Sequence, residues 1–251
     1  MKKSIVLLIA LIIMSVCPVS AGESKTGRIT GKVMMKDGGP LTGGIVNFYS
    51  ETSGPPPYPE RYWRVPDVIA DIDEEGRFST DLEEGNYYIC ALLQLSGGNV
   101  GPPEEGDYFF IGKDKDGKPR IYSLKKGESR DVGLLGEAVP FHATPAGELS
   151  GIEGTVINTE GKPVKGTIVF AFATPEMVGQ ALFVSNRTGT DGKYDLRVDE
   201  GGTYYLVVRD IYGGGPPEGG VVISGHSTIV AIVKKGELTK GLDIKVLRTP
   251  E

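Results

Sequence analysis

Cysteine, histidine and tryptophan are scarce in this chain of 251 residues, which has two cysteines, two histidines and one tryptophan. Cys17 lies in the first segment of the sequence, so a chain that has lost this segment keeps only Cys90 and can form no intrachain disulfide. Cys90 lies among apolar residues, where a buried and unreactive thiol is the usual state. Stability is therefore expected to depend on the burial of apolar side chains.

Motifs of common catalytic and metal sites are also missing. The chain has no Cys-x-x-Cys-His haem motif, no His-Glu-x-x-His zinc motif, no phosphate-binding loop and no Gly-x-Ser-x-Gly nucleophile turn. His142 and His226 lie in segments predicted to be loops, which do not hold a general base rigidly. We expect a protein without enzymatic activity, without a cofactor and without a bound metal.

One acidic segment, residues 71–76, resembles the start of a calcium loop because carboxylates alternate and a glycine is sixth. The twelfth position of such a loop needs a bidentate glutamate and is Leu82 here. We therefore favour an ordinary acidic turn over a calcium site.

An excess of positive charge is absent as well. Lysine and arginine together number 27 against 33 aspartates and glutamates, which gives a formal net charge of −6. An acidic chain without basic blocks argues against binding to nucleic acid or to anionic membrane surfaces.

A long apolar run occurs only at the front of the sequence. Residues 5–14 are apolar, follow Lys2 and Lys3, and precede the small residues of 19–21. This pattern predicts a signal peptide at 1–21 and export to the periplasm, the cell surface or the extracellular space. A membrane anchor is disfavoured because spanning requires roughly 20 residues. A lipoprotein with Cys17 as its lipidated residue is disfavoured by the signal-peptidase-like site.

Glycine is abundant, with 37 residues, and much of it belongs to an internal repeat. Six short blocks occur twice in the same order, which predicts two copies of one fold rather than a solenoid with its period of roughly 20–50 residues. We expect domains at 22–139 and 150–251 and a linker at 140–149, with a terminal strand extension as the alternative for that segment. The paired blocks are residues 29–33 and 152–156, 40–43 and 163–166, 76–78 and 192–194, 85–88 and 202–205, 101–104 and 215–218, and 125–128 and 234–237.

Short runs of β-branched and aromatic residues separated by glycine turns predict an all-β fold of two tandem β-sandwich domains. Residues 45–49 and 87–91 are such runs in the first copy, and 168–172 and 204–208 are their counterparts. Tyr87 and Tyr204 each follow a turn glycine, and we expect their rings to lie in the core with the hydroxyl reaching backbone.

The repeated blocks resemble a known family. Gly31-Lys32-Val33, Gly39-Pro40-Leu41-Thr42-Gly43, Glu75-Gly76-Arg77-Phe78 and Gly85-Asn86-Tyr87 follow the pattern of the carboxypeptidase regulatory-like domain, also called transthyretin-like or prealbumin-like. The second copy matches with Gly154-Thr155-Val156, Gly161-Lys162-Pro163-Val164-Lys165-Gly166, Asp191-Gly192-Lys193-Tyr194 and Gly202-Thr203-Tyr204. The resemblance implies a seven-stranded, Ig-like sandwich that usually serves as an accessory module of an exported protein.

Positions at which the copies differ are candidates for function. Residues 53–66 include seven more residues than the second copy has at this place, and they hold the only tryptophan. Exposed aromatic and arginine side chains are preferred interface anchors, so Tyr58, Arg61, Tyr62, Trp63 and Arg64 are candidate binding residues. The alternative is that Tyr62 and Trp63 fold back onto a sheet end or onto the second domain.

Two other loops carry weaker signals. Pro102, Pro103 and Glu104 recur as Pro216, Pro217 and Glu218, which suggests a duplicated docking loop, although Gly-Pro clusters are also ordinary turns. Residues 112–119 form a charged segment that is expected to be an exposed hairpin tip.

These observations predict an exported, non-catalytic structural or adaptor protein that binds another envelope or extracellular protein through its loops. One alternative is a carbohydrate-binding module, which would bind polysaccharide. Another is a surface or filament subunit that assembles into a homo-oligomer by strand addition.

Overall fold

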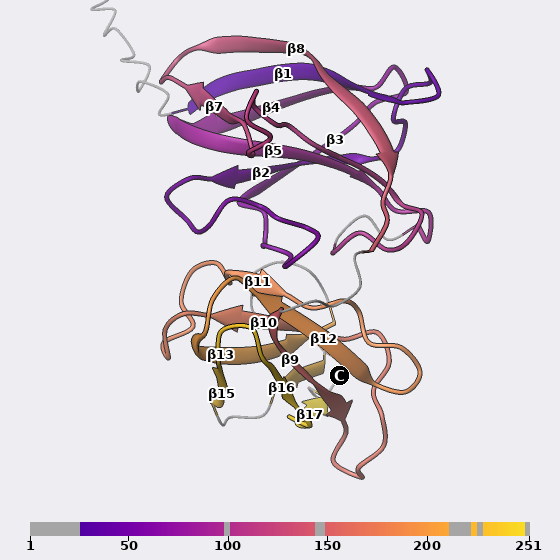
Figure 1. Cartoon of the computed structure of the whole chain (residues 1–251), viewed down its shortest axis with the longest axis vertical. Helices are drawn as coiled ribbons and strands as arrows, with labels where there is room; N and C mark the ends of the chain where they lie inside the picture. Colours follow the sequence, from indigo (N-terminus) through magenta and orange to yellow (C-terminus); the bar gives the residue numbers. More distant parts are fainter. Residues whose placement is uncertain (1–25, 98–100, 144–148, 211–221, 225–227, 249–251) are drawn as a thin grey trace, which may run out of the picture.

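The computed structural model describes residues 26–97, 101–143, 149–210, 222–224 and 228–248 (Figure 1). The predicted leader, Pro216, Pro217, Glu218 and His226 lie outside these ranges. The described residues form seventeen β-strands and no helix, which confirms the all-β prediction. Accordingly, these ranges contain no helix long and apolar enough to cross a membrane.

The first eight strands form the first unit of the structure. They make two facing sheets, one in the order β3-β2-β5-β6 with β7 also paired to β5, and one in the order β4-β1-β8. The end of β8 also pairs with β6 and so connects the two sheets. The strands are β1 (Thr26–Met35), β2 (Ile45–Ser50), β3 (Val68–Asp71), β4 (Arg77–Glu83), β5 (Gly85–Leu93), β6 (Tyr108–Ile111), β7 (Ile121–Leu124) and β8 (Ser129–Pro140).

The remaining nine strands form the second unit with a similar pairing pattern. One sheet has the order β11-β10-β13-β15, and the other has the order β12-β9-β17-β14 with β16 also paired to β9. Two such double sheets are the tandem β-sandwich arrangement expected from the sequence. The strands are β9 (Ser150–Ile157), β10 (Ile168–Phe172), β11 (Phe183–Val184), β12 (Lys193–Val198), β13 (Gly202–Arg209), β14 (Val222–Ser224), β15 (Ile229–Val233), β16 (Leu238–Lys240) and β17 (Ile244–Arg248).

Each unit has its own core, built from the alternate residues that point inward from its strands. Val46, Phe48 and Ile89 lie in the first core, and Leu196 and Leu206 lie in the second. Burial of these apolar surfaces is the main favourable contribution to folding.

The expected role of the repeated tyrosines is confirmed. Tyr87 and Tyr204 are 7% and 8% exposed and pack in the two cores. The Tyr87 hydroxyl donates to the Glu83 carbonyl at 2.9 Å, and the Tyr204 hydroxyl donates to the Glu200 carbonyl at the same distance. Each aromatic ring is thus buried while its polar end stays hydrogen-bonded.

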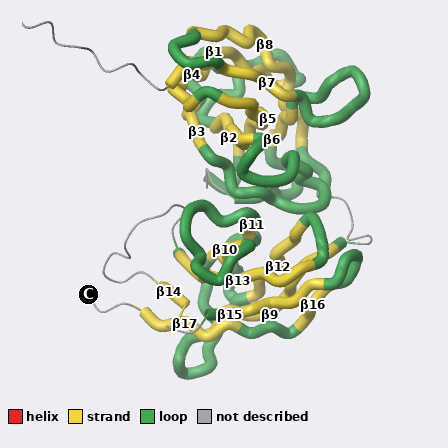
Figure 2. The backbone as a smooth tube through the Cα atoms, turned by 90° about the vertical axis from the view of Figure 1, so that its left-hand side faces the viewer, coloured by secondary structure: helices red, strands yellow, loops and turns green. Residues whose placement is uncertain are grey.

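The two units stack with one sheet facing the other (Figures 1 and 2). The outward side of β2 and β5 and the outward side of β10 and β13 meet in a third apolar cluster, which we call the junction cluster. Its buried members from the first unit are Ile45, Tyr49, Trp63, Val65, Tyr88, Cys90, Leu92, Phe109 and Phe141, and those from the second are Ile168, Phe170, Phe172, Ala181 and Val184.

The predicted linker begins too early at residue 140. Pro140 is the last residue of β8 and pairs with Tyr108, and Phe141 packs in the junction cluster. Proline is accommodated because it stands at the strand end, where a missing N–H disturbs little of the ladder. The terminal strand extension, which was the alternative, therefore describes Pro140.

Candidate functional site

The long loop between β2 and β3, residues 51–67, is the main connection between the units, and we call it the junction loop. Its residues 63–65 run antiparallel to β11, with Arg64 opposite Phe183. The Val65 N–H donates to the Leu182 carbonyl at 3.0 Å, and the Val184 N–H donates to the Trp63 carbonyl at 3.1 Å. The first unit thereby adds a short strand to the edge of the second unit's sheet.

Successive side chains of this added segment point to opposite sides, as in any extended strand. Tyr62 packs in the core of the second unit, with its ring centroid 5.4 Å from that of Phe183. Its hydroxyl donates to the Pro56 carbonyl at 2.5 Å, and burial raises the pKa of Tyr62 well above its usual value. Trp63 instead packs in the junction cluster, edge-on to Tyr49 and Phe109.

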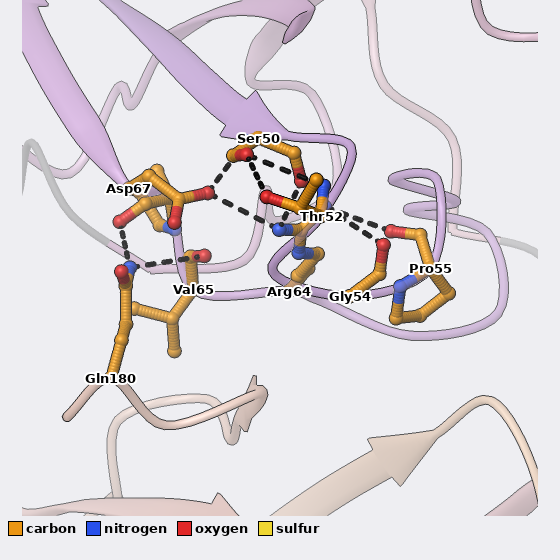
Figure 3. Close-up of polar contacts among 9 residues, drawn as sticks. Ser50, Thr52, Gly54, Pro55, Arg64, Val65, Asp67 and Gln180 are labelled. Atoms are coloured by element: carbon orange, nitrogen blue, oxygen red, sulfur yellow. Dashed lines mark hydrogen bonds and ion pairs between the residues drawn. The ribbon is translucent and has the colours of Figure 1, made fainter. Parts of the chain in front are cut away.

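Arg64 fixes the shape of the junction loop (Figure 3). Its side chain is 2% exposed, and the guanidinium donates to the carbonyls of Ser50 at 2.8 Å, Pro55 at 3.0 Å and Gly54 at 3.4 Å. It also forms an ion pair with Asp67 at 3.1 Å, and burial lowers the pKa of Arg64. One side chain of the loop therefore ties the end of β2 at Ser50 to Gly54 and Pro55.

Gln180 extends this polar connection across the junction. Its side-chain amide donates to the carbonyls of Val65 and Pro66 (Figure 3). The junction loop is thus held by backbone pairing, by aromatic packing and by a side chain of the second unit.

These contacts correct part of the predicted binding loop. Tyr62, Trp63 and Arg64 are 5%, 5% and 2% exposed and serve the junction, which is the fold-back alternative. Burial of the two rings removes apolar surface from water, and the guanidinium stays paired. Tyr58, 44% exposed, and the exposed Arg61 remain accessible, with the guanidinium carbon 5.9 Å from the centre of the Tyr58 ring.

The predicted docking loop with Pro102, Pro103 and Glu104 lies next to the junction loop. Asp107 is 3% exposed, and its carboxylate accepts hydrogen bonds from the N–H groups of Leu95 and Glu104. Gln94 donates to the Pro102 carbonyl at 3.1 Å. Pro103 is consequently buried, whereas Glu104 stays exposed.

Both loops line a cleft of about 360 Å³ at the junction of the units, which we call the junction cleft. Residues 59–63 and 102–104 contribute from the first unit. Asn186, Asp195 and Arg197 contribute from the second. The structure therefore brings the candidate loops of the first copy together, and it adds polar residues that sequence reasoning did not select.

Asp195 and Arg197 form a partly buried ionic network on β12. An Arg197 nitrogen, Nη2, contacts Asp195 at 2.5 Å and Glu153 at 3.1 Å. Burial raises the pKa of Asp195, partly offset by Arg197 and reinforced by Glu153. Asp195 and Arg197 alternate with inward apolar residues on one strand, a pattern that predicts a solvated face and does not indicate a cleft.

The other predicted features have structural roles. Asp73 accepts hydrogen bonds from the N–H groups of Glu75 and Arg77, so its carboxylate builds the acidic turn. Asp114 does the same for the exposed tip at residues 112–119, where it accepts from Asp116 and Lys118. Within the described residues, no group of three or more potential metal ligands gathers.

Two side chains of potentially reactive types, Cys90 and His142, have different surroundings. Cys90 is fully buried, and burial raises the pKa of its thiol far above the usual range. Because the thiolate is the nucleophile, this thiol is expected to be inert. His142 is exposed and bonds Glu105 at 2.8 Å.

No family model matches this chain, and a comparison with curated proteins finds no match. Among solved structures, the Bacillus anthracis TIE protein is 12% identical over 89% of this chain and 34% of its own, with a TM-score of 0.27. A streptococcal ancillary pilin is 16% identical over 90% of this chain and 63% of its own, with a TM-score of 0.26. The shaft pilin spaA from Lactobacillus rhamnosus GG is 11% identical over 91% of this chain and 99% of its own, with a TM-score of 0.26.

This chain thus spans about a third of the TIE protein and less than two thirds of the ancillary pilin. Because the TM-scores are low, the fold is assigned from the strand pairing of the chain itself. The resemblance to the carboxypeptidase regulatory-like domain stays a prediction.

Proposed function

We propose that this chain is an exported, non-catalytic structural module whose two β-sandwich units form one rigid body and dock another envelope or extracellular protein. The observation that carries the proposal is the junction, where a strand added from one unit and the junction cluster hold both units together. A large apolar interface argues against free relative motion of two domains. Such a body can present a surface in a fixed orientation, which is what an adaptor needs.

The proposed docking surface lies beside the junction, where the exposed parts of the two predicted loops meet. Tyr58, Arg61 and Glu104 are exposed there, and residues 59–61 and 102–104 line the same cleft. Tyrosine and arginine are enriched among residues that dominate binding energy. The buried Pro103 and the hydrogen bond from Gln94 to Pro102 support a preformed surface, which lowers the entropy cost of binding.

The test is co-purification from native envelope extract with the double variant Tyr58→Ala and Arg61→Ala. The variant should keep the circular dichroism spectrum and melting temperature of the parent, because both side chains lie at the surface. It should lose the protein that the parent retains.

Leu134→Ala is the matched control, because Leu134 is 59% exposed on β8 in the other sheet of the first unit. Equal recovery of the same protein by the double variant and by the control would contradict the docking surface. Recovery of only further copies of the chain would favour self-assembly instead.

A further inference from the structure

The junction cleft contains polar groups that a purely structural role does not use. Trp63 Nε1, Asp195 Oδ1 and Arg197 Nη1 are buried and have no hydrogen-bond partner among the described residues. All three side chains line this one cleft. Buried polar atoms in folded proteins nearly always have a partner, because an unpaired group loses its hydration without compensation.

The hydrogen-bonding chemistry of these atoms restricts what could bind. The indole of Trp63 and the guanidinium of Arg197 only donate, whereas the ionised carboxylate of Asp195 only accepts. A ligand that satisfies all three must accept and donate within one small space, which a hydroxyl group does. A phosphate is an anion and would be repelled by the Asp195 carboxylate, and a quaternary ammonium group has no N–H to offer and would be repelled by Arg197.

The charge of the cleft favours a neutral ligand. Its charged side chains are the acidic Glu60, Glu104 and Asp195 and the basic Arg61 and Arg197, so the two signs nearly balance. A site for a strongly charged ligand would carry an excess of the opposite sign.

The walls and size of the cleft suit a ligand that is both polar and apolar. Trp63, Phe141 and Val184 give apolar surface beside the polar groups. A volume of about 360 Å³ lies at the small end of the range for small-molecule sites. Sugar rings combine C–H faces, which contact such walls, with hydroxyl groups.

We propose that the junction cleft binds a small neutral ligand rich in hydroxyl groups, a saccharide or a polyol. Asp195 accepts from one ligand hydroxyl, while Arg197 and Trp63 donate to others. Residues of both units line the cleft, so the site exists only when the units are joined. This inference goes beyond the docking of a protein partner.

Trp63 is the only tryptophan of the chain and lines the cleft, so ligand binding there should change its fluorescence. The purified chain from residue 22 onward would be titrated with glucose, galactose, N-acetylglucosamine and glycerol, and with inorganic phosphate and choline for comparison. Calorimetry on the same samples covers binding that leaves the fluorescence unchanged. We expect saturable binding of at least one hydroxyl compound and none of phosphate or choline.

Arg197→Met and Asp195→Leu should each weaken that binding by about tenfold or more, as expected when a hydrogen bond to a charged group is lost. Asp195→Asn keeps the shape of the side chain and one acceptor oxygen. It is therefore the second variant at this position, to be used if Asp195→Leu fails to fold. Arg28→Met is the matched control, because Arg28 also pairs with an aspartate, Asp81, away from the cleft. Failure of every hydroxyl compound in both measurements would overturn the proposal, as would preferred binding of phosphate or choline, or unchanged affinity in Arg197→Met and Asp195→Leu.

Discussion

Arg64 carries a full positive charge at a place that water hardly reaches, and its surroundings are built to balance that charge. Its nitrogens donate to three backbone carbonyls and to Asp67, and its guanidinium carbon lies 5.5 Å from the centre of the Tyr49 ring. Loss of one partner from such a set leaves the others buried and unpaired.

We predict that Arg64→Met lowers the free energy of unfolding by about 3 kcal/mol, because the Gly54 and Pro55 carbonyls lose the donor that Arg64 supplies and Asp67 loses its ion-pair partner. Urea unfolding followed by circular dichroism measures the change. Arg28→Met is the control, since the Arg28–Asp81 pair is exposed and should matter little. Similar losses in both variants would show that burial of Arg64 does not stabilise the loop.

For single residues, contacts between neighbours in the chain could be predicted from the sequence, whereas contacts between distant residues could not. The hydroxyl of Tyr204 reaches a carbonyl four residues earlier, so the turn glycine and the tyrosine together contain the whole interaction. The aromatic partners of Trp63 lie on β2 and β6, and one partner of Arg197, Glu153, lies on β9, so nothing in the neighbouring residues identifies them.

The turns before β4 and β12 show how an element constrains a residue. Gly76 has a φ of 80° and Gly192 a φ of 70°, a region that favours glycine. A Cβ at Gly76 would also lie 2.5 Å from the Val33 carbonyl oxygen. The repeated glycine therefore meets both a conformational and a steric requirement.

Gly117 allows these two requirements to be separated, because its φ is 78° and a Cβ there would meet nothing within 4 Å. We predict that Gly117→Ala costs about 1 kcal/mol for the backbone conformation alone. Gly76→Ala should cost about 3 kcal/mol, because overpacking against β1 is added. Thermal unfolding measures both changes, and an equal decrease in stability in the two variants would argue against the steric contact.

The junction loop shows the limit of prediction for elements. Its prolines and aromatic residues indicate an extended segment but do not name the strand beside it. Pairing of this loop with β11 depends on how the two units are arranged. The strands within each unit, which glycine turns bound, do not depend on that arrangement.

The whole molecule is joined through the junction cluster, so the two units are expected to unfold together. Phe170 is 5% exposed in this cluster. In the parent chain, Trp63 fluorescence and far-ultraviolet circular dichroism should report one coincident urea transition.

We predict that Phe170→Asp separates these transitions, with fluorescence changing at lower urea concentration, because a carboxylate placed in this apolar cluster loses its hydration and opens the junction before the cores unfold. Ile232→Asp is the matched control, since Ile232 is 70% exposed on the edge strand β15. Coincident transitions in Phe170→Asp, at the midpoint of the control, would mean that the cluster does not couple the units.

The sequence alone determined the all-β class, the two sandwich units, the inward tyrosines and the turn glycines, because each depends on residues close together in the chain or on strand periodicity. Only the tertiary structure decided that the proline-aromatic segment is an internal joint and that Asp195 and Arg197 share a cleft with Trp63. The physical reason is that strand patterns reveal which face of a sheet is apolar, but not which distant surface covers it. Tyr62 and Trp63 carry the same apolar surface whether they bind a partner or the second unit of their own chain.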